Sequence, residues 1–132
     1  MSDKLSIQVR RSQLGRVRGT GTSSAGVHHW RAERLTSIAL IPLTLWFIFS
    51  VLRLVHMGHD GVVEWMGRPV NTVLMLALIF TTFHHTSLGL QVILEDYVHE
   101  KRLAVGAMLA QKAACWLLGL LAAVSVLKMA LH

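Results

Sequence analysis

The chain has 132 residues, of which 53% are hydrophobic and 15% charged, and its formal net charge is +6. This length suits one domain and is too short for an ordinary enzyme with a separate cofactor fold. The low charged fraction argues against a soluble domain of this size, whose surface needs more charge. Because the apolar residues also come in long blocks, the sequence predicts an all-α membrane protein.

The N-terminal part of the chain is polar and basic. Residues 1–26 are expected to form a flexible arm, since the stretch 19–26 is rich in Gly, Ser and Thr. Residues 27–34 are amphipathic and aromatic, which suits a membrane interface. A basic arm is compatible with nucleic-acid binding, but no pattern typical of such proteins accompanies it. The positive-inside rule instead predicts that the N-terminus is cytoplasmic. The basic residues before the first apolar block are Lys4, Arg10, Arg11, Arg16, Arg18, Arg31 and Arg34.

Three apolar blocks follow, and each is long enough to cross a bilayer core of about 30 Å, which needs ~20 helical residues. We expect helices at about 33–56, 69–97 and 103–129, which together form one transmembrane domain over residues 27–132. Three crossings then place the C-terminus outside, on the opposite side of the membrane from the N-terminus. Small residues at 106, 107, 110, 113, 114 and 119 predict that the third helix packs closely on its neighbours.

The second apolar block contains two adjacent histidines, His84 and His85. Polar groups inside a bilayer are costly, so each one requires an explanation. Neighbouring residues point about 100° apart around a helix, so the two side chains cannot face one small ligand. His85 has Gly89 one turn later on its own face, an arrangement that suits an axial haem ligand beside room for the macrocycle. The alternative is a histidine that hydrogen-bonds a neighbouring helix.

The other histidines lie at or beyond the edges of the apolar blocks. A haem with two histidine ligands would therefore need its second ligand from another chain. At the cytoplasmic end of the same block stand Asp96 and Tyr97, about 16 Å along the helix from His85. A carboxylate and a phenol there are able to hydrogen-bond and protonate a quinone carbonyl. The alternative is that they are ordinary residues of a helix end and an interface belt.

The segment from His85 through Gly89 to Asp96 and Tyr97 resembles the H-x3-G-x6-D-Y motif of the small hydrophobic membrane anchor of succinate dehydrogenase. The segment 28–42 resembles the entry to the first helix in the alphaproteobacterial form of that anchor. With three spans in matching positions, the resemblance covers roughly residues 24–130. Sequence patterns of the companion cytochrome b anchor are absent, which favours the small hydrophobic anchor over its companion.

The resemblance implies that His85 is one axial ligand of the iron of haem b and that Arg34 lies near the haem propionates. It implies that Tyr97 hydrogen-bonds ubiquinone and that Asp96 supports it. The second haem ligand would come from the companion cytochrome b anchor subunit.

The same resemblance implies a non-catalytic subunit of respiratory complex II, with no site for succinate of its own. Such a protein helps to dock the flavoprotein and iron–sulfur subunits at a bacterial inner membrane and contacts membrane lipid. The alternatives are an anchor of a fumarate reductase and a small non-redox accessory protein of the membrane.

Overall fold

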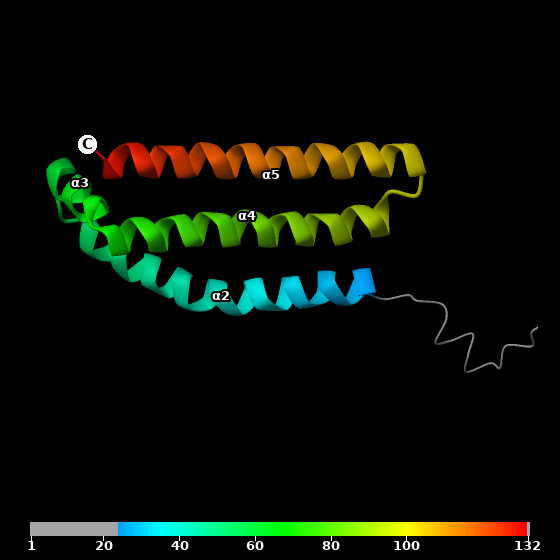
Figure 1. Ribbon diagram of the computed structural model, residues 1–132, viewed down its shortest axis with the longest axis horizontal. Coiled ribbons are helices and arrows are strands. Elements are labelled where there is room, and N and C mark those ends of the chain that lie inside the picture. The colour runs from blue at the N-terminus through cyan, green and yellow to red at the C-terminus, as the bar shows by residue number, and fades with distance from the viewer. Residues whose placement is uncertain (1–23, 132) are drawn as a thin grey trace, which may run out of the picture.

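The computed structural model describes residues 24–131, and all four elements in this range are helices. The long helices α2 (Ser24–Leu54), α4 (Pro69–Tyr97) and α5 (Lys101–Ala130) run side by side, with α4 in the middle and the short α3 (His59–Gly67) at one end (Figure 1). Each long helix is long and apolar enough to cross a membrane. The predicted all-α architecture with three spans is confirmed.

The second span begins where its sequence suggests. Pro69 occupies the first turn of α4, where its missing N–H costs nothing because that group would have no partner within the helix. The expected range of 69–97 and the observed range of α4 coincide. For the third span the expected range was 103–129, and α5 runs over Lys101–Ala130.

The first span is longer than the expected range of 33–56. It begins at Ser24, so the segment expected to lie at the interface is the first part of α2. Gly26 does not stop the helix, since one glycine costs only about 1 kcal/mol relative to alanine. The expected flexible arm lies outside the described residues, except for Ser24–Gly26, which are helical. Pro42 lies inside α2, which curves along its length (Figure 1).

A helix that the sequence did not predict stands between the first two spans. The indole of Trp65 on α3 stacks on that of Trp46 on α2, with ring centroids 5.7 Å apart and planes at 22°. Asn71 Nδ2 donates a hydrogen bond to the carbonyl of Trp65 over 2.7 Å, and Thr72 Oγ1 donates to that of Met66 over 2.6 Å. Helix α3 is therefore fixed to the ends of both α2 and α4.

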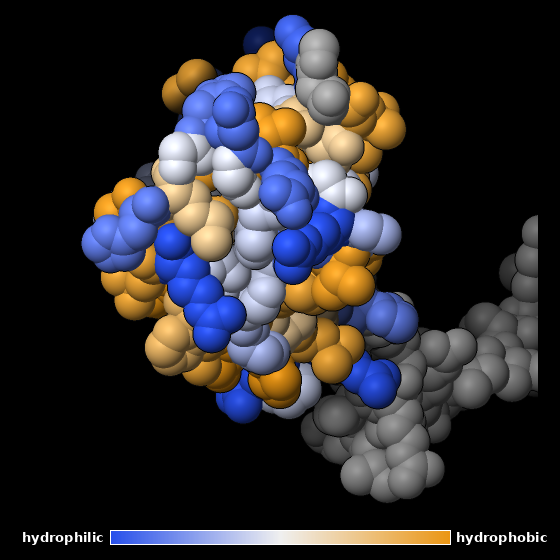
Figure 2. Space-filling model, turned by 90° about the vertical axis from the view of Figure 1, so that its left-hand side faces the viewer, coloured by the Kyte–Doolittle hydropathy of each residue, from blue (hydrophilic) through white to orange (hydrophobic). Residues whose placement is uncertain are grey.

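Most large apolar side chains point outward rather than into a core. Within the described residues, the buried hydrophobic ones are only Met66, Cys115 and Ala123. Seen from the α3 end, hydrophobic surface flanks a polar centre (Figure 2). This distribution suits helices whose surroundings are lipid and partner helices.

Helices α4 and α5 approach closely at Gly119. A Cβ added to this glycine would stand 3.4 Å from the ring of Phe83 on α4, a tight contact. Gly106, on the same helix, would meet nothing within 4 Å. The expectation that small residues of α5 permit close packing is therefore met at Gly119.

We predict that Gly119→Leu forces Phe83 aside and destabilises the α4–α5 pair by about 1–3 kcal/mol, the usual effect of overpacking. Gly106→Leu is the matched control and should have little effect. Thermal unfolding in detergent, followed by circular dichroism, compares the two variants with the wild type. Equal unfolding temperatures for both variants would show that the Gly119 contact does not stabilise the pair.

Candidate functional site

The two adjacent histidines of α4 have different surroundings. His85 faces α2, where its Nδ1 lies 2.9 Å from Oγ1 of Thr36. His84 is exposed and lines a cavity of about 310 Å³ whose walls come from α2, α4 and α5. His85 is not among the lining residues of this cavity. Adjacent residues of a helix point about 100° apart, so the side chains of His84 and His85 lie in different surroundings.

The imidazole of His85 has one nitrogen held and one without a partner. Nδ1 contacts the threonine hydroxyl, whereas Nε2 makes no hydrogen bond within residues 24–131. The residue is half-buried. An imidazole with one ring nitrogen hydrogen-bonded and the other free is the usual state of a histidine that ligates a metal.

The flank of α4 beside His85 is open. A Cβ added to Gly89, one turn after His85, would meet no atom within 4 Å. An imidazole nitrogen without a partner next to unfilled space is what a haem requires. The described residues contain no group of three or more His, Cys, Asp or Glu able to hold a metal ion. His85 offers one unpartnered ring nitrogen with open space one helical turn away, and these two features fit a haem.

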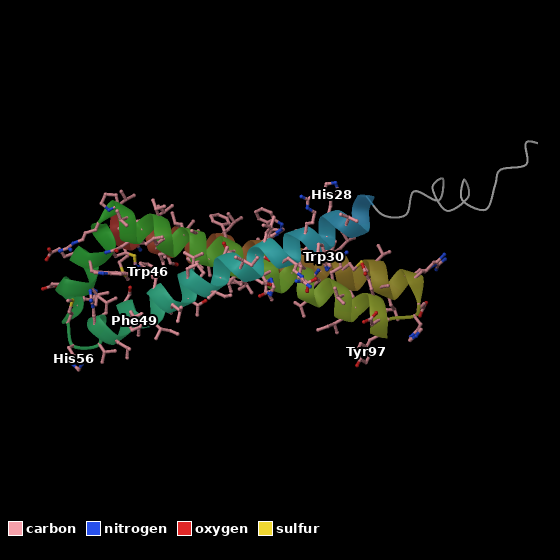
Figure 3. All side chains as sticks on the ribbon, turned by 90° about the horizontal axis from the view of Figure 1, so that it is seen from below. His28, Trp30, Trp46, Phe49, His56 and Tyr97 are labelled. Carbon is pink, nitrogen blue, oxygen red and sulfur yellow. The ribbon has the colours of Figure 1, made fainter. Side chains whose placement is uncertain are left out.

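Asp96 and Tyr97 lie at the end of α4, away from His85. Both are exposed, and 80% of Tyr97 is accessible. Figure 3 shows the Tyr97 ring pointing away from the helices, at the end of the bundle where α2 begins. Asp96 stands about 16 Å and Tyr97 about 18 Å along the helix from His85. The structure thus separates the predicted haem ligand from the predicted quinone residues.

Arg34 lies on α2, two residues before Thr36, and so near the level of His85. Its guanidinium carbon stands 4.9 Å from the ring centroid of Trp30, a cation–π contact. Both residues are exposed. The indole steadies the arginine without neutralising it, so the positive charge remains available to an anion.

Two residues near this region were missed as candidates from the sequence. Thr36 contacts His85, and His29 has a buried Nε2 without a hydrogen-bond partner among the described residues. His29 and Thr36 are seven positions apart and share one face of α2. This spacing of seven was visible in the sequence, but only the position of α4 shows that the shared face of α2 lies against His85.

Comparison with known proteins gives consistent results. The sequence profile of the family described as "Succinate dehydrogenase/Fumarate reductase transmembrane subunit" matches residues 8–127. The succinate dehydrogenase hydrophobic membrane anchor subunit of Rickettsia bellii is 29% identical over 102 residues, which cover 77% of this chain and 82% of the relative.

A protein with the same name from Paracoccus denitrificans is 26% identical over 60% of this chain and 61% of its own length. The succinate dehydrogenase membrane anchor subunit of Reclinomonas americana is 27% identical over 61% of this chain and 69% of its own length. No solved structure matches the chain significantly.

Proposed function

Because the chain belongs to the family of succinate dehydrogenase and fumarate reductase transmembrane subunits, we propose that it anchors a succinate dehydrogenase in a bacterial inner membrane. In that complex it helps to bind haem b and ubiquinone and performs no succinate chemistry itself. The observation that carries the proposal is the environment of His85. One ring nitrogen is held by Thr36, the other is without a partner in the described part of the chain, and the neighbouring Gly89 leaves space.

Nε2 of His85 would hold the haem through its iron. A second protein ligand would come from a companion anchor subunit, because His84 points about 100° away from His85 around the helix and lines the cavity instead. Arg34 supplies a cation near the level of His85, where it would pair with a haem propionate. When bound, the haem supplies one-electron redox chemistry in surroundings of low dielectric constant.

Ubiquinone accepts two electrons and two protons, so its site needs hydrogen-bond donors near the membrane surface. The Tyr97 phenol donates a hydrogen bond to one quinone carbonyl, and the Asp96 carboxylate next to it supports proton delivery. The exposure of Tyr97 in the single chain suits a residue that is covered by quinone and partner subunits.

We expect the end of the bundle that holds Tyr97 to face the soluble subunits. Basic residues precede α2, and Lys101 and Arg102 begin α5 at the same end of the bundle (Figure 1). By the positive-inside rule this end is cytoplasmic, and the C-terminal end of α5 is periplasmic. The flavoprotein and iron–sulfur subunits then dock at the cytoplasmic end, close to Tyr97.

The names of the three relatives described above favour an anchor of succinate dehydrogenase over an anchor of fumarate reductase.

The haem assignment predicts that His85→Ala abolishes haem binding, whereas His84→Ala leaves it largely intact. The complex is purified in mild detergent through a tag on this chain, and haem is measured from the reduced-minus-oxidised optical spectrum. Flavin content reports whether the partner subunits are present. Equal loss of haem from the two variants, with flavin retained, would contradict the assignment of His85.

The quinone assignment predicts that Tyr97→Phe slows succinate-dependent ubiquinone reduction by about tenfold or more. Loss of one hydrogen bond of about 1.4 kcal/mol already corresponds to a factor of ten. Succinate oxidation with an artificial acceptor that bypasses quinone should keep its wild-type rate. A loss of both activities would instead indicate a failure of assembly, and unchanged quinone reduction would refute the role of Tyr97.

A further inference from the structure

We propose that Thr36 is a positioning residue for His85, whose Nδ1–H donates a hydrogen bond to the threonine oxygen. This bond leaves the Nε2 lone pair free to bind iron, fixes the plane of the imidazole and lowers the reduction potential of the haem. The inference rests on the proposed haem site and assigns to α2 a residue that acts on the haem through its ligand.

The direction of the bond follows from the contacts of one hydroxyl group. Oγ1 of Thr36 lies 2.8 Å from the carbonyl oxygen of Ala32, 3.0 Å from that of Glu33 and 2.9 Å from Nδ1 of His85. The hydroxyl has a single hydrogen, and carbonyl oxygens can only accept. Of the three partners, only the imidazole nitrogen is able to donate.

The opposite direction is unfavourable. If Nδ1 accepted the hydroxyl hydrogen, the threonine oxygen would face two carbonyl oxygens at 2.8 and 3.0 Å with no hydrogen between them. If Nδ1–H donates, the hydroxyl hydrogen points to the carbonyls and all three contacts are attractive. In a neutral imidazole one nitrogen carries the proton, so Nε2 is the nitrogen with the free lone pair.

The threonine oxygen is itself held in place. A β-branched side chain has few rotamers in a helix, and Thr36 is further fixed by its contacts with the preceding turn of its own helix. Ser37 makes the same kind of contact, 2.8 Å to the carbonyl of Glu33, but has no hydrogen bond to another helix within the described residues. Ser37 is therefore a matched control for Thr36.

A hydrogen bond from the second ring nitrogen of a ligating histidine raises the basicity of the ligand and fixes its orientation. A more basic imidazole stabilises ferric over ferrous iron, so the potential falls. Removal of the hydroxyl should therefore shift the midpoint potential of the haem to a more positive value.

The test uses the whole complex with Thr36→Val, Thr36→Ser or Ser37→Ala in this chain. Haem and flavin contents are measured first, then the haem midpoint potential by optical redox titration and the low-spin ferric spectrum by electron paramagnetic resonance. We expect a positive shift in potential and altered g values for Thr36→Val. Thr36→Ser, which keeps the hydroxyl, and Ser37→Ala should both match the wild type.

Each outcome decides the proposal. Loss of haem in Thr36→Val with retention in Thr36→Ser also supports it, because the two variants separate the hydroxyl from packing. A wild-type potential and spectrum in Thr36→Val, or equal changes in Thr36→Val and Thr36→Ser, would overturn the role of the hydroxyl while the haem site stands. A wild-type complex that contains flavin but no haem would refute the haem site and this inference together.

Discussion

A bilayer core holds no water to satisfy polar groups, and this constraint governs how the three spans are built. Three serines of the spans meet this constraint within their own helices. Ser37, Ser50 and Ser125 each donate to the carbonyl four residues earlier. In the described part of the chain, only two side-chain hydrogen bonds join one span to another. These are Thr36 with His85, and Gln111 Nε2 to the carbonyl of Ser87 over 3.4 Å.

The same constraint explains how two adjacent histidines are accommodated in α4. His85 obtains its polar partner from α2, and His84 faces a cavity whose walls include hydroxyl and thiol groups. One histidine is thereby oriented by a neighbouring helix while the other keeps its side chain exposed. Because Gly89 is on the His85 side of the helix, the open space lies next to the histidine that has been oriented. The oriented imidazole and the open space are thus provided by residues only one turn apart.

Much of the fold was predictable because hydropathy is a property of single segments. The three spans are recognisable from their length and apolar content, and Pro69 marks the start of α4. Helix α3 was not predicted, since it is short and depends on the stack of Trp65 with Trp46, which comes from another helix. Within the candidate site, His85, Asp96 and Tyr97 were identifiable from their motif. The part played by Thr36 was not, because a contact between helices leaves no trace in the periodicity of either one.

Because α3 contacts both α2 and α4, the two ends of the α2–α4 pair differ in how many side-chain contacts hold them together. At one end, the tryptophan stack and two hydrogen bonds from α4 tie the helices together through α3. Toward the other end, the only side-chain hydrogen bond between α2 and α4 in the described residues is that of Thr36 with His85. The two helices are thus held by several side-chain contacts at the α3 end but by a single side-chain hydrogen bond near His85. A change at Thr36 therefore removes the polar link between α2 and α4 near His85, while the contacts at the α3 end remain in place.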